Sequence, residues 1–156
     1  MHTTCPPTLS IVIPTRNRPE QLLGAVQSAL SQSRQDLEVI VVDDGAALPV
    51  DLPPNPRLRS MRLDHSQGPA AARNAGLAIA RGQFVTFLDD DDRLLPHMAE
   101  ASLNAITEND LPEPVAVISG IEVINGSGSI LERRVPPTSF RGQDRKSTRL
   151  NSSHSS

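Results

Sequence analysis

Aromatic residues are scarce in this chain of 156 residues, which contains three phenylalanines and no tryptophan or tyrosine. Surfaces that hold sugar rings usually provide aromatic side chains for stacking, so the chain either binds no sugar acceptor or leaves that task to another part. Cysteine is equally scarce. Cys5 has no intrachain partner, which excludes a disulfide framework and favours the cytosol.

Long apolar runs are also missing. Residues 1–8 have no apolar core of signal-peptide length, and no window approaches the length of a membrane span. The formal net charge of −3 implies no general attraction to nucleic acid or to an anionic membrane.

Four consecutive aspartates, Asp89–Asp92, follow the apolar run 84–88. In an extended chain, side chains two residues apart point to the same side, so Asp89 and Asp91 can face one site. Oxygen ligands suit a hard ion such as Mg²⁺ or Mn²⁺ that also binds substrate phosphates. The alternative is a solvated acidic turn in which Asp92 caps a helix that we expect to begin at Leu94.

Apolar runs and helical periodicity alternate along the chain. This alternation predicts an α/β fold with three layers and a mostly parallel sheet flanked by helices. A proline-rich loop is expected over 46–56, and Gly82 is expected to close the second helix. The predicted strands are 9–14, 38–42, 57–63 (a weak edge strand), 83–88 and 115–119; the predicted helices are 19–32, 68–80 and 94–106; a hairpin is predicted over 121–124 and 129–133.

Ligands of such sheets bind outside the carboxyl ends of the strands. Asp43 and Asp44 end one predicted strand, and Asp89–Asp92 end another. We therefore expect both acidic segments at the same edge of the sheet.

The composition changes near the end of the chain. Residues 144–156 are rich in serine and arginine, which predicts a disordered tail, and they resemble translated sequencing-adapter sequence. We expect a flexible N-terminus over 1–8, a partial domain over 9–143 that is truncated on its C-terminal side, and a non-native tail over 144–156.

Several segments together resemble the nucleotide-binding half of family 2 glycosyltransferases, which have the Rossmann-like GT-A fold. They are Leu9–Arg18, Val39–Gly45, Gly68–Gly76 and Phe87–Asp92. The resemblance covers roughly residues 9–106, and the four motifs occur in the family's order and approximate spacing.

The resemblance implies a role for each matching position. Asp43 or Asp44 would bind the base, Arg73 the base or the diphosphate, and the Asp-x-Asp pair the ribose and a divalent cation. The residues implied in donor binding are Pro14, Thr15, Arg16, Asp43, Asp44, Arg73, Asp89 and Asp90, and the implied ligands of Mg²⁺ or Mn²⁺ are Asp89 and Asp91.

Two departures from the family pattern stand out. Many relatives carry an aromatic residue where this chain has Arg16. The family's general base lies in a later segment, and Glu113, Glu122 and Glu132 lie in no segment that matches it, so we assign no base.

Plainer interpretations of the same residues stay open. Asp43 and Asp44 could only shape a turn with Gly45. Arg73 could be a solvated helix residue. Arg16 and Arg18 form either a weak anion-binding pair at a helix N-terminus or solubilising charge, and the histidines His65 and His97 are expected on the surface or in loops.

The function implied by the resemblance is metal-dependent, inverting transfer of a sugar from a UDP-, GDP- or dTDP-sugar to an acceptor hydroxyl on a sugar, lipid-linked or protein acceptor. This chain would supply the donor-binding half. The alternatives are a nucleotide-sugar-binding fragment without catalysis, or a nucleotidyltransferase, although 14–18 contains no glycine. No nucleic acid is expected as a partner. The location is expected to be cytoplasmic, or peripheral to the inner face of the membrane in the full-length protein.

Overall fold

The structure, a computed structural model, describes residues 6–108 and 115–135. The chain divides into two compact units, Met1–Val115 and Ala116–Ser156. The tail predicted over 144–156 and most of the N-terminus predicted to be flexible lie outside the described residues, as does Glu113.

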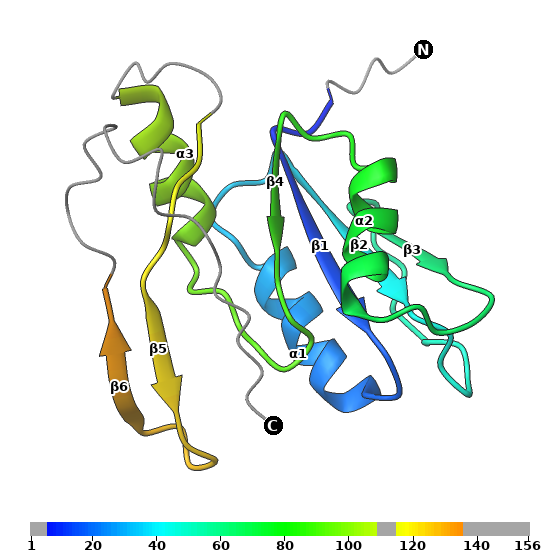
Figure 1. The fold of residues 1–156 in the computed structure, drawn as a ribbon. Helices are drawn as coiled ribbons and strands as arrows, with labels where there is room; N and C mark the ends of the chain where they lie inside the picture. Colours follow the sequence, from blue (N-terminus) through cyan, green and yellow to red (C-terminus); the bar gives the residue numbers. More distant parts are fainter. Residues whose placement is uncertain (1–5, 109–114, 136–156) are drawn as a thin grey trace, which may run out of the picture. The chain divides into compact units, whose positions relative to one another are not determined.

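The first unit contains a four-stranded parallel sheet in the order β3-β2-β1-β4 (Figure 1). Its register aligns Ile11 with Val39 on one side and with Thr86 on the other. The strands are β1 (Leu9–Thr15), β2 (Leu37–Asp43), β3 (Leu58–Arg62) and β4 (Phe84–Phe87). The two central strands are buried along their whole length, as expected for parallel strands covered on both faces.

Helices cover both faces of this sheet and complete the three predicted layers. Helices α1 (Pro19–Leu30) and α3 (Met98–Glu108) pack against the face that carries Ile11, Ile13 and Val39. Helix α2 (Pro69–Ile79) packs against the opposite face, which carries Val12, Ile40 and Val42. The alternation of inward side chains along β1 and β2 therefore supplies two cores, one on each side of the sheet.

A buried carboxylate joins the amino ends of the strands. Glu38 Oε1 accepts hydrogen bonds from the Ser10 hydroxyl and the Arg81 backbone N–H, and its Oε2 accepts one from Arg59 Nη1 at 3.0 Å. Burial alone would raise the pKa of Glu38, but these three donors outweigh it and lower the pKa. Hydrogen bonds to Glu38 thus connect β1, β2, β3 and the segment after α2.

Gly82 has a different role from the predicted one. We expected it to close α2, but the helix already ends in an extended Ala80. A Cβ at Gly82 would lie 2.5 Å from the Ser10 backbone nitrogen, and the Gly82 N–H donates to the Ser10 hydroxyl. The glycine is needed because the chain passes close to β1 there, which is a tertiary requirement.

Several predicted boundaries differ from those in the structure, and for helix α3 the hydrogen bonds show the reason. Helix α3 begins at Met98 rather than Leu94, because Leu94–Pro96 is held in a non-helical form by bonds to the end of α1 and to Ser33. Strand β1 continues through Pro14 to Thr15, and α1 ends at Leu30 rather than at residue 32. The predicted strand over 115–119 is absent, and residues 116–120 are exposed.

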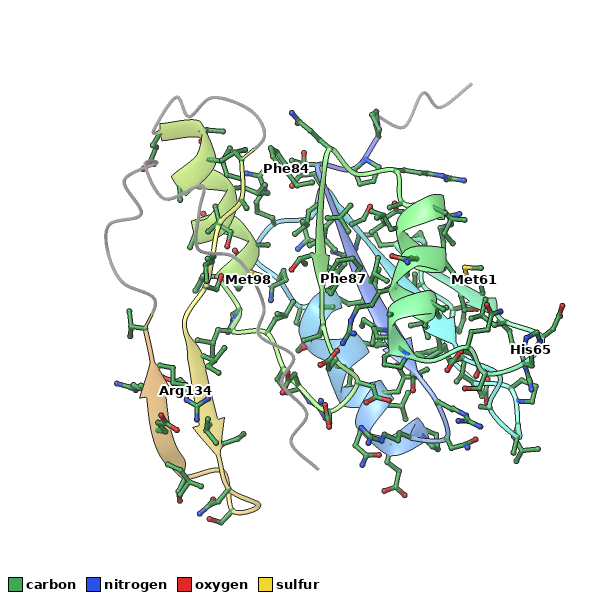
Figure 2. All side chains as sticks on the ribbon, viewed as in Figure 1. Met61, His65, Phe84, Phe87, Met98 and Arg134 are labelled. Atoms are coloured by element: carbon green, nitrogen blue, oxygen red, sulfur yellow. The ribbon has the colours of Figure 1, made fainter. Side chains whose placement is uncertain are left out.

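The second unit contains the predicted hairpin. Strand β5 (Ile121–Ile124) pairs antiparallel with β6 (Ile130–Arg134), and Glu122 forms an ion pair with Arg133. Glu132 pairs with Arg134, whose side chain is labelled on β6 in Figure 2. None of the helices in the described part of the chain has the length and apolar character of a membrane span.

Candidate functional site

A cavity of about 490 Å³, here called the pocket, lies at the carboxyl ends of the strands in the first unit. Its walls come from the end of β1, the turn before α1, the residue after β2, the loop before α2, the first turns of α2 and the segment after β4. The lining residues are Pro14, Thr15, Arg16, Arg18, Asp44, Ser66, Gly68, Pro69, Ala72, Arg73, Asp89, Asp90 and Asp91.

The acid loop, Asp89–Asp92, follows β4 and presents its carboxylates in two ways. Asp90 is buried and accepts a hydrogen bond of 2.8 Å from the Thr15 hydroxyl. Asp89 and Asp91 lie on either side of it with about half of each side chain exposed. The loop therefore directs one carboxylate inward, onto the end of β1, and two toward the pocket.

Arginines contact the three carboxylates of the acid loop that line the pocket. Arg18 Nη1 lies 3.2 Å from Asp90 Oδ1 and 3.1 Å from Asp91 Oδ2. Arg73 Nη2, from α2, is bonded to Asp89 Oδ1. These contacts join the residue before α1 and the first turns of α2 to the acid loop, which lies more than 70 residues after Arg18.

Helix α1 also holds the chain that follows the acid loop. The Ser28 hydroxyl accepts from the Leu94 N–H, and the buried Gln32 side chain donates to the Leu95 carbonyl and accepts from the Ala99 N–H. Ser28 lies in the last turns of α1, and Gln32 follows the end of that helix and also donates from its side chain to the Ser28 carbonyl. The acid loop is thus fixed by Thr15 on one side and by α1 on the other.

The structure separates the two aspartates at the end of β2. Asp44 lines the pocket and accepts hydrogen bonds from the Ser66 hydroxyl and from the N–H groups of Gln67 and Gly68. Burial opposes its ionisation, but these donors, together with the charge of Arg16, lower the pKa of Asp44. Asp44 is therefore an ionised group that shapes the entry to α2.

Asp43 does not line the pocket. Its Oδ1 accepts from the Ala46 N–H at 2.8 Å, and its Oδ2 lies 3.6 Å from Arg62 Nε. It is almost fully buried. The turn-forming interpretation therefore fits Asp43, whereas Asp44 combines a turn with a place on the pocket wall. Gly45, with φ of +64°, makes the turn possible where the chain meets the backbone of His65 and Ser66.

Most of the residues singled out from the sequence meet at this pocket. Pro14, Thr15, Arg16, Asp44, Arg73 and Asp89–Asp91 all line it, whereas Asp43 does not. Arg18, Ser66 and Gly68 also line it without having been assigned there. The sequence predicted Arg18 only as part of a pair with Arg16, either anion-binding or solubilising, because the contact of Arg18 with Asp90 joins positions far apart in the sequence.

The acidic-turn alternative fails in one respect. Helix α3 begins at Met98, so Asp92 is too early to cap it. The Asp92 N–H instead donates to the Asp89 carbonyl within the acid loop. Burial, and then the charges of Asp91 and Asp89, raise the pKa of Asp92.

The chemistry of the pocket fits a hard divalent cation. Asp89 and Asp91 provide partly exposed carboxylate oxygens on one wall, the ligand type that Mg²⁺ and Mn²⁺ prefer. Within residues 6–108 and 115–135 there is no cluster of three or more metal-ligating side chains. A cation with one or two protein carboxylates would complete its shell with water and substrate oxygens.

Comparison with known families gives one match that covers most of the chain. The model of the family described as glycosyl transferase family 2 matches residues 10–153. This range contains all the residues that line the pocket.

Curated relatives match the same region. The succinoglycan biosynthesis protein ExoO of Rhizobium meliloti is 39% identical over 94 residues, which are 58% of this chain and 27% of that protein. An uncharacterised glycosyltransferase of Haemophilus influenzae is 36% identical over 67% of this chain and 44% of its own length. A GalNAc(5)-diNAcBac-PP-undecaprenol beta-1,3-glucosyltransferase of Campylobacter jejuni is 41% identical over 57% of this chain and 31% of its length. This chain thus spans less than half of each of these relatives.

Solved structures of S. aureus TarS share the fold. The structure of TarS 1-349 aligns with a TM-score of 0.58 and 25% identity over 66% of this chain and 33% of that one. The complex of TarS 1-349 with UDP aligns with a TM-score of 0.59 and 22% identity over 75% of this chain and 41% of that one. The mostly parallel sheet flanked by helices is therefore the GT-A-like architecture of these proteins.

Proposed function

This chain belongs to glycosyl transferase family 2, and we propose that it is the donor-binding half of an enzyme that moves a sugar from a nucleotide sugar to an acceptor hydroxyl with inversion. The observation that carries the proposal is the pocket, where aspartates from two strand ends and arginines from two helix starts meet. This arrangement suits a ligand that combines a base, a diphosphate and a divalent cation.

The individual roles follow from position and chemistry. Asp44 accepts an N–H of the base, and Arg16, on the same wall, lies against the base or ribose. Asp90 holds Thr15 and the acid loop together. Asp89 and Asp91 hold Mg²⁺ or Mn²⁺, which when bound neutralises charge that develops on the leaving diphosphate. In this proposal Arg73, from the first turns of α2, binds phosphate oxygens, and the partial positive charge of that helix end favours the same anion.

The acceptor and the general base belong to the rest of the protein in this proposal. Glu122 and Glu132 are each paired with an arginine of β6, and we assign a base to neither. The names of two relatives refer to succinoglycan and to an undecaprenol-linked saccharide. We therefore propose polysaccharide or cell-wall biosynthesis with a lipid-linked acceptor, in the cytoplasm or at the inner face of the membrane.

The test is a thermal-shift comparison of UDP, GDP and dTDP, each with Mn²⁺, Mg²⁺ or EDTA. UDP is the first nucleotide to try because the TarS structure was solved with it. We expect one nucleoside diphosphate with a metal to raise the melting temperature, and inorganic pyrophosphate with the same metal to raise it less. No shift with any nucleotide would contradict donor binding by this chain.

A further inference from the structure

Arg18 contacts two carboxylates of the acid loop with a single nitrogen. Its Nη1 lies within 3.2 Å of both Asp90 Oδ1 and Asp91 Oδ2. A guanidinium has five N–H donors in a planar fork. Within residues 6–108 and 115–135 only Nη1 of Arg18 has side-chain partners, which leaves the other donors to a ligand in the pocket that Arg18 lines. About half of the Arg18 side chain is exposed, so this contact is weak and exchangeable.

Holding Asp90 in place does not depend on Arg18 alone. The Thr15 hydroxyl bonds the other oxygen of Asp90 at 2.8 Å, inside the protein. The contact of Arg18 with the exposed Asp91 adds no comparable anchor. What Arg18 does add is a positive charge beside carboxylates that a divalent cation would need.

The charges of the pocket favour joint binding of a cation and an anion. Three arginines (Arg16, Arg18, Arg73) and four aspartates (Asp44, Asp89, Asp90, Asp91) line it, a formal charge of −1. A divalent cation alone would compete with Arg18 and Arg73 for carboxylates. A diphosphate with two negative charges, bound without the cation, would be repelled by the aspartates. The divalent cation and the diphosphate together add no net charge to the pocket. The diphosphate also offers its oxygens to the arginines that the cation displaces from the aspartates.

We propose that Arg18 binds the diphosphate of the donor and otherwise competes with the divalent cation for Asp91, so that metal and nucleotide bind together. This proposal rests on the proposed function and extends it to a residue that was not assigned there. The two affinities should therefore change in opposite directions: removal of Arg18 strengthens binding of the metal alone and weakens binding of the nucleotide.

The test measures Mn²⁺ binding without nucleotide, and UDP binding at saturating Mn²⁺, by calorimetry on the 156-residue chain. We expect Arg18→Gln to bind Mn²⁺ about threefold tighter than the unaltered chain, because a competing cation is removed. We expect the same variant to bind UDP about tenfold more weakly, because a charge-assisted phosphate contact is lost. Unchanged or weaker Mn²⁺ binding would overturn the proposal.

Arg34→Gln is the matched control. Arg34 pairs with the carboxylate of Asp36, and neither residue lines the pocket, so this variant removes the same charge and one ion pair elsewhere. It should leave both affinities unchanged; an equal Mn²⁺ gain in this control would reduce the effect to net charge and overturn the proposal. Arg18→Lys keeps the charge without the fork, so it should retain weak Mn²⁺ binding. A threefold Mn²⁺ gain in Arg18→Lys would contradict competition by charge.

Failure of this proposal can be told apart from failure of the proposed function. If the unaltered chain binds no nucleotide with any metal, donor binding itself is wrong. If it binds UDP with Mn²⁺ but Arg18→Gln binds both ligands as the unaltered chain does, only the role of Arg18 is wrong. Melting temperatures of all variants establish that each is folded before its affinities are compared.

Discussion

Buried carboxylates occur at both ends of the sheet in the first unit, and the two ends use them differently. At the amino ends of the strands, both oxygens of Glu38 accept hydrogen bonds from Ser10, Arg81 and Arg59. At the carboxyl ends, only Asp90 of the acid loop is buried, whereas Asp89 and Asp91 are half exposed. A carboxylate whose partners all belong to the protein stabilises the fold, whereas one that faces a pocket is available to a ligand.

Removal of Glu38 should have the largest effect on stability. Glu38→Ala leaves Ser10, the Arg81 N–H and Arg59 without their acceptor, and we expect a loss of about 3 kcal/mol in the free energy of unfolding. Urea unfolding measures it. Glu38→Gln, which can still accept from Ser10, should lose less. If Glu38→Ala unfolds at the urea concentration of the unaltered chain, the amino end of the sheet does not depend on this carboxylate.

For Asp91 we expect a small effect on stability and a large effect on ligand affinity. This side chain is 56% exposed, so Asp91→Asn should change the free energy of unfolding by no more than about 0.5 kcal/mol. Its affinity for UDP in the presence of Mn²⁺ should fall about tenfold, because one carboxylate ligand of the cation is lost. Calorimetry with and without EDTA measures this. A variant that keeps its full Mn²⁺-dependent affinity would remove Asp91 from the proposed metal site.

A fall in pH should reduce the stabilisation that carboxylates provide at both ends of the sheet. The pKa values of Glu38 and Asp44 are lowered in the folded chain, so each ionised carboxylate stabilises the fold above its unfolded pKa. This stabilisation is lost as the pH falls through about 4 and below. Melting temperatures from pH 6 to pH 3.5 should fall less steeply in Glu38→Gln and in Asp44→Asn than in the unaltered chain. Parallel curves for all three proteins would contradict these contributions.

The smallest effect on UDP affinity is expected at Ser28, which connects α1 to the segment after the acid loop. Ser28→Ala leaves the Leu94 N–H without its acceptor and should cost about 1 kcal/mol in unfolding free energy. Affinity for UDP with Mn²⁺ should fall only about twofold, because Thr15 still holds Asp90. A tenfold loss of affinity would mean that α1, more than β1, positions the acid loop.

The parts of this fold that the sequence predicts are those with local periodicity. The buried runs of β1 and β2 and the shared edge of the two acidic segments follow from apolar strands in an α/β pattern. The run over 115–119 has similar composition but forms no strand. A strand needs a neighbouring strand to bond, and composition does not reveal whether one is present.

Long-range contacts account for what the sequence did not predict in the site. Four adjacent aspartates do not show which one turns inward, and the choice of Asp90 depends on Thr15. Arg18 and Ser66 become part of the pocket only when distant segments meet. Likewise, Asp43 and Asp44 are alike in sequence, and their partners distinguish them: Arg62 of β3 contacts Asp43, whereas the loop before α2 donates to Asp44.

The difference between the two ends of the sheet can be tested most directly by Mn²⁺ broadening of backbone amide signals in NMR spectra, recorded with UDP. Seven-residue strands such as β1 span roughly 20 Å, far enough for the two ends to respond differently to a paramagnetic ion. We predict strong broadening at Thr15, Asp89 and Asp91, and sharp signals at Ser10 and Glu38. Broadening that is equal at both ends, or strongest near Glu38, would contradict a metal-nucleotide site at the acid loop.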